Sequence, residues 1–362
     1  MTTALTAFDG LSDKQTHNQL VQAAQLIRSG ELVCFPTETV YGLGADATNT
    51  DAVARIFEAK GRPSDNPLIV HIAQIEMWLM LARGIDSRAL LLAERFWPGP
   101  LTIVLPRTEM VTDIVTAGLN TVGVRMPSHP LARSLIRESN RPLAAPSANR
   151  SGRPSPTTAQ AALEDMNGLI PLILDGGPCL VGVESTVLDL SRTPPIVLRP
   201  GGVTVESLRE FLPDVTVDPS ALSPLLGHQE AASPGMKYRH YAPRIPLIVV
   251  TGDQQIETLL RLYNEAVSSG EQPILLVSDE TQRTIVNRLL ITGRSDMKFR
   301  STGLGSHDNL EDISSRLFGV LRGLDDSGAT VAYAESFSSE GAGLALMNRL
   351  LRAAGFNTVN SD

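Results

Sequence analysis

Lysine, cysteine and long hydrophobic runs are scarce or missing in this 362-residue sequence. The formal net charge is −8, which argues against a general nucleic-acid coat protein, because such proteins depend on a basic surface that releases counterions. No apolar run approaches the length of a membrane span, so we expect no transmembrane helix and no membrane partner. The first fifteen residues lack both a basic start and an apolar core, so we expect no secretory signal.

The two cysteines, Cys34 and Cys179, each lie in or near an apolar, strand-like run. This setting is typical of buried thiols and not of a disulfide or a metal site, so we predict a cytoplasmic protein without a protein-held metal. Lysine occurs only at positions 14, 60, 237 and 298. A lysine that falls inside a motif is therefore a candidate for function.

The length, a hydrophobic content of 42% and a mean hydropathy near zero predict a globular chain of two domains. In the first half, apolar spacing predicts helices over residues 15–29, 51–59 (capped by Asn49 or Thr50) and 128–139. Apolar, β-branched runs predict strands that include residues 31–35 and 121–127.

Residues 35–46 (FPTETVYGLGAD) are the most unusual stretch. A strand that ends in proline, hydroxyl residues and two glycines before a helix brings its backbone to the carboxyl edge of a sheet, where α/β folds bind ligands. The alternative is a tight turn in which Gly42 and Gly44 only provide left-handed backbone conformations. Thr37, Thr39 and Tyr41 favour a site, because a turn needs none of them.

A second polar loop, residues 145–157 (APSANRSGRPSPT), follows another predicted strand. Loops of this composition are commonly only turns, but this one repeats the arrangement of the first motif. Six arginines lie between Arg125 and Arg153, against a single acid. Arg133 and Arg137 fit a solvated helix face, whereas Arg125 and Arg153 flank the loops and are better binding candidates.

The common phosphate-binding motifs are absent from the sequence. No lysine is preceded by glycine, which excludes a P-loop, and no glycine pair continues into a dinucleotide fingerprint. No zinc-protease motif or nucleophile elbow occurs either. The remaining set of Thr, Ser, Asn, Arg and one Lys is suited to holding phosphates and a carboxylate.

From about residue 246 onward, strands alternate with helices. Apolar runs predict strands near 247–250, 274–277 and 330–334, and helices near 254–267, 308–324 and 344–354. This alternation predicts a smaller, Rossmann-like parallel α/β domain. Its glycine pair, Gly341 and Gly343, is a weak phosphate signal that we interpret as structural packing.

These residues resemble the YrdC-type threonylcarbamoyl-AMP synthases. The resemblance covers residues 15–212, in the segments 35–43 (FPTETVYGL), 60–62 (KGR), 66–68 (NPL), 97–102 (WPGPLT), 124–127 (VRMP), 146–149 (PSAN), 185–187 (STV) and 198–201 (LRPG). Residues 233–243 (SPGMKYRHYAP) resemble the linker of the long, two-domain form. The resemblance implies a twisted mixed-sheet domain with a concave ligand pocket over residues 1–213, a linker or lid over 214–245 and an additional domain over 246–362.

The resemblance also implies an activity and its partners. The reaction would convert L-threonine, bicarbonate or CO2, and ATP to threonylcarbamoyl-AMP and pyrophosphate, for threonylcarbamoyladenosine modification of tRNA by a downstream transferase. A pocket without an acid/base dyad fits such chemistry, which depends on alignment and charge neutralisation. Mg²⁺ is expected on the phosphates without a carboxylate cage of the protein. A weak RNA contact is a further expectation.

Site residues carried over from the resemblance form two groups. Those expected to contact ATP are Lys60, Arg62, Asn66, Thr121, Ser147, Asn149, Ser155, Arg199 and Tyr241, and among these Lys60 and Arg62 are expected to act in catalysis. Those expected to hold threonine are Thr39, His71, Arg125, Ala145 (through its backbone) and Ser185. Tyr241 and its neighbours in 234–243 would close over the pocket as a lid, or alternatively anchor the linker to the C-terminal domain.

Two other functions use the same residues. A double-stranded RNA-binding protein would use the arginine cluster, and its affinity would fall steeply with salt and ignore threonine. A nucleotide-sensing regulatory protein would bind ATP without releasing pyrophosphate. An assay of pyrophosphate release separates both from the synthase.

Overall fold

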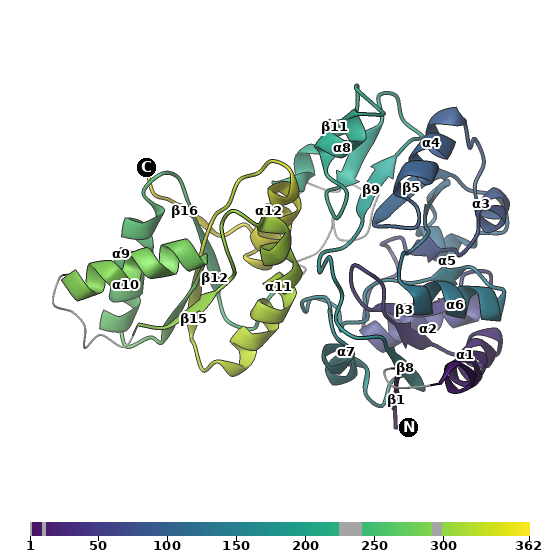
Figure 1. The fold of residues 1–362 in the computed structure, drawn as a ribbon, viewed down its shortest axis with the longest axis horizontal. Coiled ribbons are helices and arrows are strands. Elements are labelled where there is room, and N and C mark those ends of the chain that lie inside the picture. The colour runs from purple at the N-terminus through teal and green to yellow at the C-terminus, as the bar shows by residue number, and fades with distance from the viewer. Residues whose placement is uncertain (1, 9–11, 224–240, 292–298) are drawn as a thin grey trace. The chain divides into compact units, whose positions relative to one another are not determined.

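The computed structural model describes residues 2–8, 12–223, 241–291 and 299–362. The chain divides into two compact units, one formed mainly by residues up to Ala221 and the other by residues from 241 to Asp362 (Figure 1). Each unit contains its own sheet. This matches the fold class expected from the sequence, a mixed-sheet domain followed by a small parallel α/β domain.

The first unit contains an eleven-stranded mixed sheet. Its strand order is β1-β8-β2-β3-β7-β4-β6-β5-β9-β10-β11. The bounds are β1 (Ala4–Ala7), β2 (Val33–Phe35), β3 (Gly42–Asp46), β4 (Ile69–His71), β5 (Leu101–Pro106), β6 (Thr121–Arg125), β7 (Leu143–Ala144), β8 (Leu172–Asp175), β9 (Thr186–Asp189), β10 (Ile196–Arg199) and β11 (Thr216–Val217). Among these, β4 and β6 are parallel neighbours whose carboxyl ends meet at one edge.

The glycine-rich end of the first motif is a strand, so the alternative of a tight turn is wrong. Gly42–Asp46 forms β3, which pairs antiparallel with β2 and places Gly44 opposite Val33. Gly42 and Gly44 do not have a positive φ. Glycine is required at Gly44 because a Cβ atom would lie 2.6 Å from Cε1 of Phe35, whose ring packs over the strand. The requirement for glycine at position 44 therefore comes from close packing and not from a left-handed backbone conformation.

Side chains cap several helices of the first unit, and the cap at Asn49 is one of the two that the sequence predicts. Asn49 caps α2 by accepting hydrogen bonds from the N–H groups of Asp51 and Ala52, and His129 accepts one from Leu131 at the start of α6. The helices are α1 (Asp13–Arg28), α2 (Thr50–Lys60), α3 (Ile75–Leu81), α4 (Ser87–Phe96), α5 (Asp113–Thr116), α6 (Pro130–Ser139), α7 (Ala159–Met166) and α8 (Val205–Arg209), with a 3-10 turn at Pro219–Ala221. The predicted helices over 15–29, 51–59 and 128–139 are thus confirmed to within a few residues.

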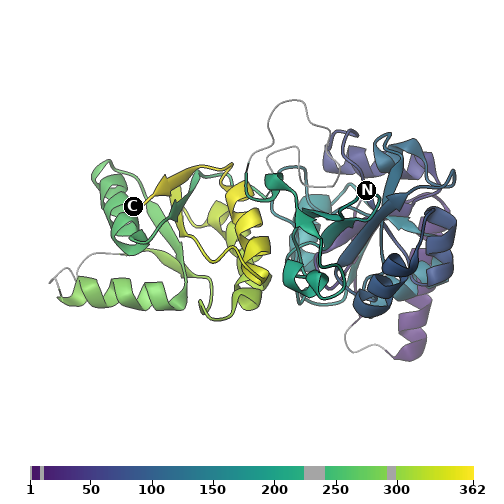
Figure 2. The same cartoon turned by 90° about the horizontal axis from the view of Figure 1, so that it is seen from above.

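The second unit is a five-stranded parallel sheet in the order β14-β13-β15-β12-β16. Figure 2 shows α9 and α10 on one face of this sheet and α11 and α12 on the other. The bounds are β12 (Leu247–Thr251), α9 (Gln255–Ser268), β13 (Pro273–Val277), α10 (Asp279–Ile291), β14 (Ser301–Gly303), α11 (Leu310–Gly323), β15 (Val331–Glu335), α12 (Ala342–Ala353) and β16 (Thr358–Asn360), with a 3-10 turn at Leu324–Asp326. The alternation predicted from the sequence is confirmed.

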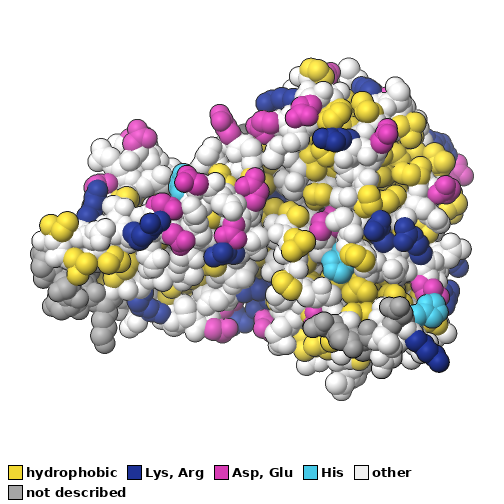
Figure 3. Space-filling view, viewed as in Figure 1, with side chains coloured by type: hydrophobic (Ala, Val, Ile, Leu, Met, Phe, Trp, Pro, Cys, Tyr) yellow, Lys and Arg dark blue, Asp and Glu magenta, His cyan; other side chains and the backbone are white. Residues whose placement is uncertain are grey.

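On the face of the molecule shown in Figure 3, positively and negatively charged side chains of the described residues are interspersed. This mixture is unlike the basic surface of a nucleic-acid coat protein. Within the described ranges, no helix combines the length and the apolar character that crossing a membrane needs.

The buried thiols allow a first prediction. Cys34 and Cys179 are free and buried, as the sequence predicts. Burial raises the pKa of Cys34 well above its usual value and raises the pKa of Cys179 to about 12. Because the thiolate is the reactive form, we expect neither thiol to react with Ellman's reagent at pH 8 in the folded protein, and both to react within seconds in guanidinium chloride. Rapid reaction of one thiol in the folded protein would contradict this burial.

Candidate active site

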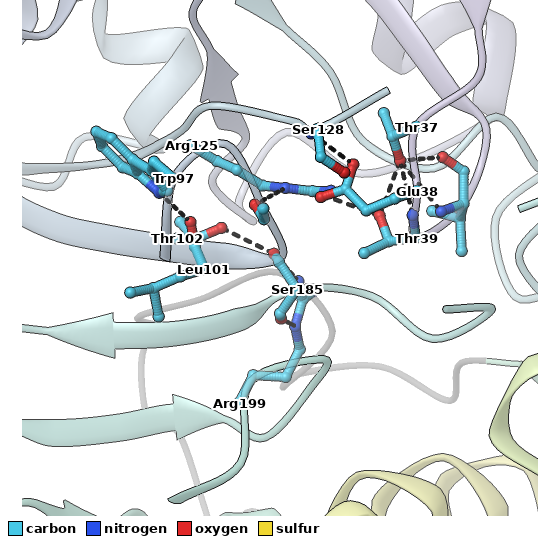
Figure 4. Close-up of polar contacts among 12 residues, drawn as sticks. Thr37, Glu38, Thr39, Trp97, Leu101, Thr102, Arg125, Ser128, Ser185 and Arg199 are labelled. Carbon is cyan, nitrogen blue, oxygen red and sulfur yellow. Dashed lines mark hydrogen bonds and ion pairs between the residues drawn. The ribbon is translucent and has the colours of Figure 1, made fainter. Parts of the chain in front are cut away.

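The centre of the first sheet gathers buried polar side chains at one edge. His71 ends β4 and Arg125 ends β6, and the two residues are register partners on these parallel strands, so both side chains lie on one face of the sheet. The loop after β2 brings Thr37, Glu38 and Thr39 to the same place (Figure 4). All five residues are buried.

Arg125 is held on three sides. Its Nε atom donates to the carbonyl oxygen of Gly99 at 3.2 Å, and Nη1 donates to Oγ1 of Thr39 at 3.0 Å. Its Nη2 atom lies 2.7 Å from Oε1 of Glu38. These contacts fix the plane of the guanidinium group inside the site.

Glu38 is a buried carboxylate bound from two directions. Its Oε2 atom accepts a hydrogen bond of 3.0 Å from the N–H of Ser128, and Oε1 faces Arg125. Burial would raise the pKa of Glu38, but the positive charge of Arg125 and the hydrogen bonds outweigh it and hold the pKa below its usual value. Glu38 is therefore charged at neutral pH.

His71 is neutral at physiological pH. Burial, followed by the positive charge of Arg125, lowers the pKa of His71 to about 3. Its ring packs edge-to-face on Phe35 with the ring centroids 6.1 Å apart. The Nδ1 atom is buried and has no hydrogen-bond partner in the described part of the chain, which leaves it available to a ligand.

Ser185 lies beside this group in a second hydrogen-bonded set. Its hydroxyl is 2.8 Å from Oγ1 of Thr102, and its carbonyl accepts hydrogen bonds from Nε and Nη2 of Arg199 at 3.2 and 3.0 Å (Figure 4). Gly201 lets the two segments approach closely, because a Cβ atom there would lie 2.3 Å from the carbonyl oxygen of Glu184. The predicted residues Ser185 and Arg199 are thus brought together.

Lys60 joins α2 to the second polar loop. Its ammonium group donates to the carbonyl oxygens of Ser147 and Asn149, both at 2.5 Å, and the residue is 3% exposed. The Ser147 hydroxyl in turn donates to Oδ1 of Asn149 at 2.5 Å. Lys60 therefore fixes the conformation of a loop that carries two of the predicted ATP contacts.

Arg62 and Asn66 lie in the loop between α2 and β4. Nη2 of Arg62 donates to the carbonyl oxygens of Asn66 and Pro67 at 3.1 and 3.2 Å. The amide of Asn66 is fully buried, and neither its nitrogen nor its oxygen has a hydrogen-bond partner among the described residues. Unpaired buried amides are rare in folded proteins, so this side chain is a candidate for ligand binding.

The comparisons with known proteins match both units. A sequence profile described as "Telomere recombination" (Sua5_yciO_yrdC) matches residues 25–201, and one described as "Threonylcarbamoyl-AMP synthase, C-terminal domain" matches residues 203–355. The threonylcarbamoyl-AMP synthase of Pyrococcus abyssi is 45% identical over 93% of this chain and 94% of its own length. That of Bacillus subtilis is 44% identical over 97% and 98%, respectively.

The chain belongs to the threonylcarbamoyl-AMP synthase family. Its activity is the synthesis of threonylcarbamoyl-AMP, and the RNA-binding and sensor alternatives are not favoured. A crystal structure of P. abyssi Sua5 with L-threonine has a TM-score of 0.90 to this chain at 43% identity, covering 99% of this chain and all of that one. The resemblance and the two-part fold inferred from the sequence are thus confirmed.

The synthase structure brings most of the predicted residues into small groups. Thr39 contacts Arg125, and His71 is the register partner of Arg125. Ala145 uses its N–H to bind the carbonyl of Ile69, so a backbone contact with a ligand would use its carbonyl oxygen. Ser155 is fully buried and donates to Oε1 of Glu184 at 2.7 Å. Thr121 begins β6 and lines a cavity of about 10 Å³.

Tyr241 packs within the second unit. Its ring lies 5.0 Å from that of Phe318, and Cζ of Arg349 lies 5.8 Å from its centroid. This packing resembles the anchor that the sequence leaves as an alternative, and the ATP contact of Tyr241 stays a prediction. Residues 234–240 of the predicted lid segment 234–243 lie outside the described residues.

Sequence reasoning missed Glu38 and Thr102. Both lie inside the segments that carry the family resemblance, next to Thr39 and Leu101, but no spacing in the sequence pairs Glu38 with Arg125 or Thr102 with Ser185. The only signal available was a carboxylate between two threonines in a strand-end motif.

Proposed function

We propose that threonine binds at Thr39, His71, Arg125, Ser185 and the carbonyl of Ala145, and that ATP binds at the residues of the 60–66 and 147–155 loops together with Thr121 and Arg199. This division into two sites is supported by the positions of buried polar atoms that have no hydrogen-bond partner among the described residues. His71 and Asn66 each present unpaired polar atoms, one on the sheet edge and one on the cationic loop. Arginine beside these atoms supplies the charge that a carboxylate and phosphates need.

The proposed chemistry joins three substrates. The amine of threonine attacks the carbon of bicarbonate and water leaves, which gives a carbamate. A carbamate oxygen then attacks the α-phosphorus of ATP, with pyrophosphate leaving. The protein contributes alignment and charge neutralisation, which is the main requirement of phosphoryl chemistry. We assign charge neutralisation to Arg62 and alignment of Ser147 and Asn149 to Lys60.

Mg²⁺ would enter with ATP. Among the described residues, no group of three or more His, Cys, Asp or Glu side chains is placed to hold a metal. The donors around the ATP side are instead hydroxyl, amide and cationic groups, so the phosphates would supply the ligands of the ion. The cation would neutralise the leaving pyrophosphate.

The product would pass to a transferase that modifies adenosine in tRNA. A transfer partner is required because threonylcarbamoyl-AMP is a mixed anhydride that water hydrolyses, and a weak RNA contact and a cytoplasmic location would fit this role.

The test is an assay of pyrophosphate release in which each substrate is omitted in turn. We expect release only with threonine, bicarbonate and ATP together, because the carbamate is the attacking group. If pyrophosphate is still released without bicarbonate, threonine itself, and not its carbamate, would be the group that attacks the α-phosphorus of ATP. Binding of ATP without release under any combination would instead support the sensor.

A further inference from the structure

Gly123 is unusual in the large sheet because it lies in the middle of β6 and is only half-buried. β6 pairs with β4 on one side and with β5 on the other. Successive residues of a strand point to opposite faces, so Thr121, Gly123 and Arg125 share the face that carries the candidate active site. On the other face, Val122 and Val124 are buried. The φ of Gly123 is not positive, so the backbone conformation does not require glycine, and glycine inside a strand often marks a place where a ligand approaches closely.

The missing side chain leaves a shallow depression in this face of the sheet. A Cβ atom at Gly123 would lie 3.1 Å from Cγ2 of Thr102, 3.6 Å from Cγ2 of Val104 and 3.9 Å from Cγ1 of Ile69. Val104 and Ile69 are the register partners of Gly123 on the two neighbouring strands, so the floor is the backbone of β6 and the walls are aliphatic groups. The enclosed part measures about 10 Å³, which is room for about one water molecule. A ligand would therefore lie across this depression and not inside it.

The lining of the depression is uncharged. Among the described residues, those that line its cavity are apolar residues, a glycine and three threonines. On β9, Asp189 is the register partner of Val104, but its carboxylate binds Arg192 at 3.0 Å. Arg199 donates to the Ser185 hydroxyl at 3.2 Å, which places its charge at the other end of the site. Phosphates need cationic or N–H donors, so the depression suits a flat, uncharged and largely apolar group.

The course of β6 fits the length of a nucleotide. Four residues separate Thr121 from Arg125, which is about 13 Å at the rise of a β-strand, and Gly123 lies half-way between them. In the proposed function, threonine is held at Arg125, so the α-phosphate of ATP must also lie near this end of the strand. The nucleoside then extends toward Thr121, and its base reaches the uncharged depression.

We propose that the adenine base of ATP lies flat on the sheet over Gly123, between Thr102 and Val104 on one side and Ile69 on the other, with the hydroxyl of Thr121 at its edge. The inference rests on the proposed ATP site and assigns the base to a place within it. Thr121 accordingly contacts the nucleoside and not the phosphates. Glycine at position 123 keeps every side chain off the surface on which the base lies.

Replacing Gly123 by alanine tests this placement, because the added methyl group fills the depression. Thr102 cannot yield easily, since it is fully buried and its hydroxyl lies 2.8 Å from that of Ser185. Calorimetry on the full chain should show ATP and AMP binding at least about tenfold more weakly to Gly123→Ala than to the wild-type protein, because overpacked contacts are costly. Inorganic triphosphate and threonine should each change by less than about threefold, because neither reaches the depression.

Gly319→Ala is the matched control. Gly319 is an exposed residue of α11 in the second unit, and a Cβ atom there would contact nothing outside its own part of the helix within 4 Å. This variant should bind all four ligands as the wild-type protein does.

Three results with Gly123→Ala would overturn the inference. Unchanged affinity for ATP would show that no part of ATP lies over Gly123. Equal weakening of ATP and inorganic triphosphate would place the phosphates there instead. Weakening of threonine together with ATP would show that the methyl group acts through Thr102 and Ser185.

Photolabelling of the wild-type protein with 2-azido-ATP decides the question if Gly123→Ala fails to fold or if inorganic triphosphate does not bind detectably. The label is expected on β4, β5 or β6, and a label found only elsewhere would refute this position of the base. A wild-type protein that binds no ATP would refute the proposed ATP site itself, so the two failures are distinguishable.

Discussion

Replacing Lys60 by methionine is expected to lower the free energy of unfolding and to abolish pyrophosphate release. Methionine keeps the length of the stem but removes the ammonium group that binds the half-buried carbonyl of Ser147 and the buried carbonyl of Asn149, both at 2.5 Å. Each unpaired buried polar group costs about 1–3 kcal/mol. We therefore expect a loss of about 2–6 kcal/mol in urea unfolding, with the Ser147–Asn149 loop displaced from its position.

Lys14→Met is the control for this measurement, because Lys14 is an exposed residue of α1. That substitution should change neither stability nor activity, as expected for surface positions. If Lys60→Met loses activity while its unfolding curve is unchanged, the ammonium group acts on the substrate directly. The loop-positioning role would then be wrong.

Arg125→Lys is expected to weaken threonine binding by about a hundredfold while changing ATP affinity by less than about threefold. The guanidinium group reaches Gly99, Thr39 and Glu38 at once, and a single ammonium group cannot reproduce this planar fork or a bidentate grip on a carboxylate. Lysine is chosen because alanine would leave Glu38 as an unpaired buried charge, which is costly by itself. Calorimetric titration with each ligand gives the two affinities.

Arg199→Lys is the matched variant on the other side of Ser185. Arg199 is also buried and binds the Ser185 carbonyl through Nε and Nη2, but we assign it to ATP. The expected pattern is therefore the reverse, with ATP weakened more than threonine. Equal weakening of both ligands by Arg125→Lys would move Arg125 to the phosphate side.

Much of the fold could be predicted from local signals. The cap at Asn49 and the alternating strands and helices of the second unit depend on neighbouring residues, and the structure agrees with them. The short edge strands β1, β11, β14 and β16 carry too few residues for a periodic signal. The hairpin of β2 and β3 was missed because glycines in a sequence usually indicate a turn. The reason for glycine here is the ring of Phe35 that packs against it, and this contact cannot be seen in the sequence.

The site was predictable in its residue types but not in its pairings. Family resemblance supplied Arg125 and Thr39, which lie 86 residues apart along the chain. It did not supply Glu38, because the role of a carboxylate depends on which cation the fold places beside it. Lys60 was expected to contact ATP and to act in catalysis, whereas its bonds to Ser147 and Asn149 show an additional task in the loop.

The order of strands in the large sheet has a consequence for synthesis on the ribosome. Both β1 and β2 pair with β8, and Thr3 bonds to the carbonyl of Ile170, 167 residues later. Until β8 has left the exit tunnel, the hairpin of β2 and β3 keeps an unpaired edge, although Val33–Phe35 is wholly buried in the finished protein. Non-local pairing of this kind is slow, and open apolar edges aggregate. Nascent chains that stop before residue 172 should therefore depend on chaperones, whereas chains extended past β11 should fold to a protease-resistant sheet.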